Sequence, residues 1–189
     1  MKKGTSKGVI VVGSARADGN TGLVVRQFAS LSHYDIIDLN ALQIGYFDYE
    51  QAVRDDDFMS TIETILRYDV IVFAAPVYWY SMSAVMKTFF DRISDLLKWH
   101  KETGRRLRGK SMALISTSEK QWIDPVFAFP FEQTASYLGM RYLGYLHCPT
   151  IRSELPDTSI RLLDDFVRML ESTQPAQTEL KSRVEPSQV

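Results

Sequence analysis

The fold is decided by the stretch Val9-Ile10-Val11-Val12-Gly13-Ser14-Ala15-Arg16-Ala17-Asp18-Gly19-Asn20-Thr21, near the start of the 189-residue chain. Four apolar residues in a row are typical of a strand that is buried on both faces, and the polarity changes at Gly13. We therefore interpret the stretch as a strand, a loop and the start of a helix. We expect Asn20 or Thr21 to cap that helix.

The loop after this strand carries the side chains of a phosphate site. Ser14, Asn20 and Thr21 can donate hydrogen bonds, and Arg16 can bind an oxyanion through two parallel N–H groups. The new helix would point free backbone N–H groups and the positive end of its dipole at the same place. The alternative is that Asn20 or Thr21 only caps the helix and that Gly13 and Gly19 only turn the chain, which requires no ligand. That alternative does not explain why the loop also contains an arginine and two hydroxyl groups. We therefore favour a bound phosphate.

The composition describes one globular domain. The chain is 45% hydrophobic and 24% charged, and its net charge of −1 gives no overall field that would attract nucleic acid or an acidic membrane surface. No stretch approaches the ~18 apolar residues of a membrane span, and the first apolar run ends too early for a secretory signal. We expect a soluble cytoplasmic protein with no nucleic-acid or membrane partner. Residues 1–172 would form the domain, and residues 173–189 a polar, mobile tail.

Cysteine content excludes several kinds of site. Cys148 is the only cysteine of the chain, so an internal disulfide, an all-cysteine zinc site and an iron–sulfur cluster are excluded. Because Cys148 follows an apolar segment, we expect it to be a small packed residue rather than a redox group.

Apolar runs and helical spacings alternate along the rest of the chain. Further strands are predicted at residues 34–39, 69–75, 112–115 and 141–146. Helices are predicted at residues 20–32, 57–67, 83–98, 127–138 and 157–170. This alternation predicts an α/β fold with a doubly wound parallel sheet and helices on both faces.

Two more loops follow predicted strands at the same edge of the sheet. Residues 76–83 include three consecutive aromatic residues, which cannot all enter the core, and residues 116–122 begin with three hydroxyl side chains. The aromatic rings could instead cover the ends of neighbouring helices. Together with the first loop, the two loops would fit a phosphate, a chain of hydroxyl groups and a flat heteroaromatic ring, which are the parts of flavin mononucleotide (FMN).

These residues resemble a known family. Gly13-Ser14-Ala15-Arg16 with Gly19-Asn20-Thr21, and the run from Pro76 to Arg92, resemble the two signatures of the NADPH-dependent FMN reductase family of flavodoxin-like proteins. The resemblance spans about residues 7–170. It implies a five-stranded sheet of order 2-1-3-4-5 and bound FMN. It also implies hydride transfer from NADPH or NADH through the flavin to a quinone, azo, nitro or flavin acceptor.

The resemblance also implies roles for individual residues. The residues that would hold the phosphate are Ser14, Arg16, Asn20 and Thr21. The residues that would line the flavin ring are Pro76, Val77, Tyr78 and Trp79, and those near its pyrimidine side are Ser116, Thr117 and Ser118. Charged residues with a structural role would be Lys87, Asp91 and Arg92. No catalytic side chain is predicted, because the flavin itself performs the redox chemistry. Many relatives carry glycine where Tyr80 stands.

The alternative function is a flavodoxin-like electron carrier that is not an enzyme. Dedicated carriers tend to be markedly acidic, which steers them to basic partners, and a net charge of −1 argues against that role. We also expect a homodimer or homotetramer, because a flavin cleft on so small a domain is shallow and a second subunit could wall it.

Three polar segments have competing interpretations. Residues 104–111 match the phosphate-loop pattern of nucleotide hydrolases, but a helix precedes them and a strand follows, which is the reverse of what that loop needs. The basic residues between Lys98 and Lys110 form a solvated connector, or one of their arginines contacts the adenosine phosphate of NADPH, either within the chain or across a dimer interface. The aspartates at 55–57 favour a helix start over a metal site.

Overall fold

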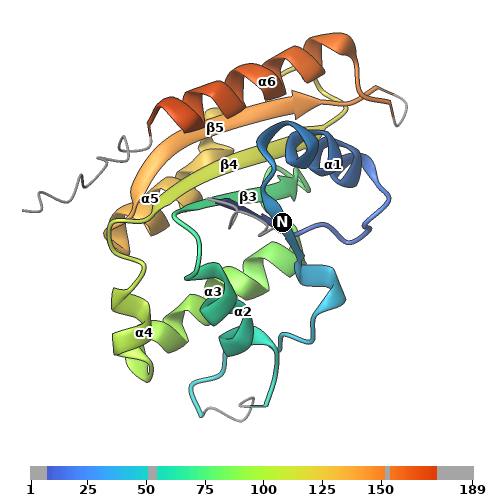
Figure 1. Ribbon diagram of the computed structural model, residues 1–189. Helices are drawn as coiled ribbons and strands as arrows, with labels where there is room; N and C mark the ends of the chain where they lie inside the picture. The colour runs from blue at the N-terminus through green and yellow to red at the C-terminus, as the bar shows by residue number, and fades with distance from the viewer. Residues whose placement is uncertain (1–7, 51–54, 152–153, 174–189) are drawn as a thin grey trace, which may run out of the picture.

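The computed structural model describes residues 8–50, 55–151 and 154–173, and a five-stranded parallel sheet forms its centre (Figure 1). The strands are β1 (Gly8–Val12), β2 (Asp35–Asp38), β3 (Val70–Pro76), β4 (Ser111–Ser118) and β5 (Arg141–Pro149). Their order is β2-β1-β3-β4-β5, and every neighbouring pair is parallel. The predicted flavodoxin-like order 2-1-3-4-5 is therefore confirmed.

Helices connect the strands and cover both faces of the sheet. They are α1 (Asn20–Ser32), α2 (Phe58–Ile65), α3 (Ala84–Lys98), α4 (Lys101–Arg105), α5 (Phe129–Tyr137) and α6 (Asp157–Ser172), with short 3-10 turns η1 (Leu39–Ala41) and η2 (Pro125–Ala128). The helix predicted at 127–138 is divided into η2 and α5, since prolines stand at the start of both elements. The predicted tail lies outside the described residues except for Thr173.

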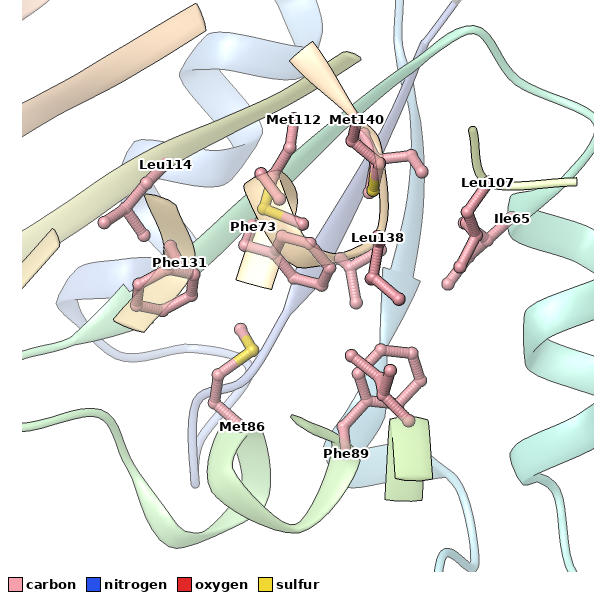
Figure 2. Packing of buried hydrophobic residues seen from close by; sticks show 14 of the residues in the cluster. Ile65, Phe73, Met86, Phe89, Leu107, Met112, Leu114, Phe131, Leu138 and Met140 are labelled. Atoms are coloured by element: carbon pink, nitrogen blue, oxygen red, sulfur yellow. The ribbon is translucent and has the colours of Figure 1, made fainter. Parts of the chain in front are cut away.

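Alternation along the strands divides the core into two halves. In β1, Ile10 and Val12 pack with α1 and α6, whereas Val9 and Val11 pack with the helices of the other face. The β3 residue Phe73 shows how that other face is filled, by rings from α3 and α5 (Figure 2). Both faces of the central strands are apolar for this reason, as the unbroken run at residues 9–12 indicates.

Two predicted strands are too short, and one is slightly too long. The strand predicted at 112–115 continues to Ser118, and the strand predicted at 141–146 continues to Pro149. The strand predicted at 34–39 is one residue too long at each end, because β2 spans only Asp35–Asp38. The change from apolar to hydroxyl side chains does not end β4, because its ladder continues on both sides, with Ser116 opposite both Ala75 and His147. Polar side chains can remain in a buried strand when they find partners.

Cys148 lies in this extension of β5 and is fully buried. Burial raises the pKa of its thiol to about 11, so the reactive thiolate is suppressed at neutral pH. This supports the prediction of a packed residue. Over the described part of the chain, no helix is both long enough and apolar enough to cross a bilayer.

Candidate active site

Three loops meet at the carboxyl edge of the sheet. They follow β1 (residues 13–19), β3 (77–83) and β4 (119–124). The Ser83 hydroxyl donates to the Gly13 carbonyl at 2.5 Å, which ties the start of α3 to the first loop. The hydroxyl oxygens of Thr21 and Thr117 are 2.7 Å apart, which ties the start of α1 to the end of β4. Three segments that are distant in the sequence therefore form one surface.

The start of α1 has no side-chain cap. Gly19 occupies the cap position and makes no side-chain hydrogen bond to the helix, so the prediction that Asn20 or Thr21 caps it is wrong. Thr21 lies inside the helix and uses its hydroxyl on β4 instead. The first backbone N–H groups of α1 consequently have no capping oxygen, and the positive end of the dipole is available to an anion.

The first loop passes close over this helix start. A Cβ atom on Gly22 would lie 1.8 Å from the Ala17 carbonyl oxygen, so only glycine allows the loop to lie so near. The Arg26 guanidinium donates to the same oxygen at 3.2 Å. Residues 13–19 are thus held in one arrangement over the first turn of α1, beside its backbone N–H groups.

The side chains predicted to bind phosphate lie in this loop and in the first turn of α1. The Ser14 hydroxyl is buried and donates to the Arg16 carbonyl at 3.1 Å. The Arg16 side chain is exposed, lies beside Gly19, and its guanidinium has no hydrogen-bond or ion-pair partner within the described residues. Asn20 is partly exposed on the first turn of α1. One free cation and several free N–H groups therefore point to an anion site.

The loop after β3 is a tight turn with a strained tip. Tyr78 and Ser81 exchange two backbone hydrogen bonds of 2.9 Å, and between them Trp79 and Tyr80 have φ angles of 49° and 65°. Two left-handed residues in succession define a type I′ turn, which glycine and asparagine favour. This explains why glycine suits the Tyr80 position. The turn leaves the Trp79 side chain 93% exposed.

A cavity of about 630 Å³ lies between this turn and the segment after β4. Its lining residues are Val77, Trp79, Tyr80, Ser118, Glu119, Lys120, Trp122, Ile123, Asp124 and Phe127. Three of the residues predicted to contact a flavin ring are among them: Val77, Trp79 and Ser118. Pro76, Tyr78, Ser116 and Thr117 do not line it.

For Pro76, Ser116 and Thr117 the reason for the difference is their position in the sheet, whereas Tyr78 lies in the turn and exposes its ring outside the cavity. Pro76 is the last residue of β3 and is buried, and Ser116 and Thr117 lie inside β4, also buried. The hydroxyls of Ser116 and Thr117 bond to His147 and Thr21 rather than facing the cavity. The sequence shows that a strand ends near here, but a shift of one or two residues decides which hydroxyl reaches the surface.

His147, a half-buried residue at this site, was not identified from the sequence. His147 of β5 places Nδ1 3.0 Å from the Ser116 hydroxyl and Nε2 2.9 Å from the Lys120 carbonyl oxygen. The contacts span 31 and 27 residues, so no spacing in the sequence reveals them. The serine is fully buried and cannot reach a substrate, and this pair is not a hydrolase dyad.

The basic stretch lies at the opposite edge of the sheet. From the loop edge, α3 carries the chain away over 15 residues, about 22 Å, and β4 returns over eight residues, about 26 Å. Arg106 pairs with Glu63 at 2.8 Å, and Arg105 pairs with Glu102. These arginines are therefore far from the cavity of their own chain, so a contact with NADPH could be made only at the cavity of a second subunit. The helix α4 before residue 106 and the strand after residue 110 confirm the reversed context of the phosphate-loop pattern.

The charged residues of α3 make ion pairs, as a structural role requires. Lys87 bonds Asp91 at 2.5 Å on the exposed side of the helix. Arg92 is buried and bonds Asp95 at 2.8 Å and Asp56 through a second nitrogen. A buried cation with two carboxylates holds the segment before α2 against α3.

The central aspartate of the acidic cluster, Asp56, acts in this network. Its carboxylate accepts the N–H of Phe58 at 3.0 Å, at the first residue of α2, and the N–H of Gly45 at 2.9 Å. Burial disfavours its charged form, but the Arg92 guanidinium and the two N–H groups outweigh that effect, so the pKa of Asp56 lies below its ordinary value. The carboxylate is thus a helix-start and ion-pair group, as the sequence favours.

With this geometry established, comparison with known proteins assigns the family. The model of a family described as NADPH-dependent FMN reductase matches residues 6–144. The chain belongs to the NADPH-dependent FMN reductase family. Membership confirms the prediction of an oxidoreductase that uses FMN and NAD(P)H.

Individual members and folds agree with this assignment. The Bacillus subtilis (strain 168) protein YwqN, provisionally named an NAD(P)H-dependent FMN-containing oxidoreductase, is 30% identical over 72% of this chain and 81% of its own. A solved structure of the Trp repressor binding protein from Bacillus subtilis has a TM-score of 0.67 at 23% identity, covering 89% of this chain and all of that one. General stress protein 14 from Treponema denticola, solved in complex with FMN, has a TM-score of 0.57 at 17% identity. The match covers 88% of this chain and 97% of that one. Both structures share the fold of this FMN reductase.

Two structural observations indicate that the residues of this FMN reductase fit its cofactor. The uncapped start of α1, beside the uncommitted Arg16, suits a phosphate dianion. The neighbouring cavity of about 630 Å³, with apolar and aromatic walls, has the size of pockets that hold cofactors.

Proposed function

We propose that FMN binds with its phosphate at residues 13–21 and its ring in the cavity between the turn after β3 and the segment after β4. The phosphate contacts would be Ser14, Arg16, Asn20 and Thr21, and the ring contacts Val77, Trp79 and Ser118. The observation that carries this proposal is the bond between the hydroxyls of Thr21 and Thr117, because it joins the anion site to the strand that ends at the cavity.

The threonine pair also has the right chemistry for a phosphate. One hydroxyl donates to the other, and the second hydroxyl hydrogen has no other partner within the described residues. That hydrogen can be donated to a phosphate oxygen. Together with Arg16 and the N–H groups of α1, the chain offers both charge and directed donors.

The remaining residues around the cavity suit a flat electron acceptor. FMN, when bound, supplies the hydride chemistry, and the protein orients it and limits access to it. Trp79, Tyr80 and Trp122 line the cavity with largely exposed rings, which can stack on nicotinamide and then on a planar acceptor. We therefore propose a quinone, azo, nitro or flavin acceptor that uses the same opening as NAD(P)H in turn.

Exposed rings at the cavity and on the neighbouring helix α5 support a dimer or tetramer. Trp79 is 93% exposed, Trp122 68% and Phe129 56%, and covering them with a second copy would remove apolar area from water. Sedimentation velocity should then show a homodimer or homotetramer at micromolar concentration, and Trp122→Glu should shift it toward monomer. A wild-type chain that sediments as a monomer would contradict this part of the proposal.

Anaerobic spectroscopy tests the proposed reaction. The purified protein is loaded with FMN, its visible spectrum is recorded, and NADPH or NADH is added without oxygen. Bleaching of the flavin absorbance within seconds, followed by recovery on addition of a quinone, supports the reductase. A yellow protein that neither nucleotide bleaches would be an electron carrier, and a protein that binds no FMN would contradict the site. The Arg16→Ala/Thr21→Val double variant should remain colourless.

A further inference from the structure

His147 lies behind the wall of the cavity and contacts two wall residues, Ser118 and Lys120, as well as the buried Ser116. Its Nδ1 is 3.0 Å from the Ser116 hydroxyl, and its Nε2 is 2.9 Å from the Lys120 carbonyl oxygen and 3.3 Å from the Ser118 hydroxyl. The ring is partly buried, and it does not line the cavity. It therefore touches the segment that forms the wall rather than the space inside.

The partners of the ring determine its tautomer. A carbonyl oxygen can only accept, so the nitrogen facing Lys120 must carry hydrogen. Nδ1 of the neutral ring then has a lone pair, which accepts the hydroxyl hydrogen of Ser116. Ser116 is fully buried, and its hydroxyl has no other partner within the described residues. The neutral Nε2–H form satisfies every group in the cluster.

This cluster sets the course of the chain at the cavity. The backbone N–H of Lys120 donates to the Ser118 hydroxyl at 3.2 Å, so the segment is bonded both to itself and to His147. The Lys120 ammonium lies 5.4 Å from the centre of the Tyr80 ring, which belongs to the opposite wall. The segment held by His147 therefore reaches across the mouth of the cavity.

We propose that His147 is a positioning residue, which fixes Ser118 and Lys120 in the wall through its Nε2–H bond to the Lys120 carbonyl. The proposal rests on the proposed function, because the wall is taken to be one side of the flavin site. His147 touches neither cofactor nor substrate and acts only through this segment. Loss of its bond would let the wall move, and FMN would bind less tightly.

The tautomer can be measured without FMN. Long-range ¹H–¹⁵N spectra of the ¹⁵N-labelled FMN-free protein, with the His147 signals assigned by their loss in His147→Gln, distinguish the two neutral forms. At a pH where the ring is neutral, we expect the proton on Nε2. A proton on Nδ1 would place no donor opposite the Lys120 carbonyl and would overturn the proposal.

Two substitutions separate the bond from the mere presence of a side chain. The amide of His147→Gln can reach the place of Nε2 and donate to Lys120, whereas the shorter His147→Asn reaches only the place of Nδ1. The FMN dissociation constant, from titration of flavin fluorescence, should rise about tenfold in His147→Asn and less than about threefold in His147→Gln. The matched control is His100→Asn, at an exposed histidine on the far edge of the sheet, which should bind FMN like the wild type.

The outcomes distinguish this inference from the function on which it rests. If wild-type protein binds no FMN, the proposed function fails, and the inference fails with it. If wild-type protein binds FMN and His147→Asn and His147→Gln bind it equally well, tightly or weakly, the inference alone is overturned. Where His147→Gln does not fold, the His147 signals are the set that remains after those of the exposed His33 and His100 are assigned by substitution, and a proton on Nδ1 still overturns the proposal.

Discussion

The link between the hydroxyls of Thr21 and Thr117 can be tested with a double-mutant cycle. Valine has nearly the shape of threonine, so Thr21→Val and Thr117→Val remove one hydroxyl each and little else. The two threonines are 2% and 1% exposed, and their oxygens are 2.7 Å apart. Each single variant leaves one buried hydroxyl without a partner, which should lower the free energy of unfolding by about 1–3 kcal/mol.

The double variant has no orphaned hydroxyl and should cost less than the sum of the two single variants. We expect a coupling energy of about 1 kcal/mol or more. Urea unfolding of the FMN-free protein at pH 7 measures it, with unchanged urea m-values as a check on the unfolded state. The control is Thr64→Val on α2, whose hydroxyl bonds only the backbone of its own helix, and whose effect should be within about 0.5 kcal/mol. Strictly additive costs would refute the link between α1 and β4.

Three further perturbations test the site and its supports. Arg16→Ala should raise the FMN dissociation constant about 10- to 100-fold in a fluorescence titration, because a charge-assisted contact is lost, and Arg161→Ala on the exposed side of α6 should leave it unchanged; equal affinities would exclude Arg16 from the phosphate site. Tyr80→Gly should raise the free energy of unfolding by up to about 1 kcal/mol, because it relieves a residue held at φ 65°, and a lower melting temperature would contradict the strain. Asp56→Asn should lower the free energy of unfolding at pH 7 by about 3 kcal/mol, since Arg92 loses a buried partner. Because the folded-state pKa of Asp56 lies below its ordinary value of 3.8, the wild type keeps this contribution above about pH 4 and loses it progressively as the pH falls further; a difference from the variant that does not shrink below pH 4 would contradict the assignment.

The helix capping and the β4 boundary show where reasoning along the chain was insufficient. Thr21 has the side chain of a capping residue at the start of a helix, but it serves a strand 96 residues away, and Gly19 takes the cap position. Ser116 resembles the first residue of a loop, but it pairs with His147 inside the sheet. In both cases a local preference worth about 1 kcal/mol is overcome by a buried hydrogen bond to a distant partner.

In the turn after β3, the sequence predicted the exposure of the side chains but not the conformation of the backbone. Three aromatic residues predict exposed rings, which the structure confirms, because no loop of that length can bury them all. The left-handed conformation of Trp79 and Tyr80 could not be read from their side chains, which disfavour it. It follows from the two bonds between Tyr78 and Ser81, which close the turn.

The sequence by itself determined the fold class, the strand order implied by the family signatures, and the loops in which the candidate site lies. These features depend on the periodicity of apolar side chains and on short motifs, which are local properties of the chain. Only the tertiary structure decided which side chains meet: Thr21 with Thr117, Ser116 with His147, and Arg92 with Asp56 across 36 residues. Such pairs form because a buried polar group must find a partner, and packing of the sheet and helices decides which distant group is within reach.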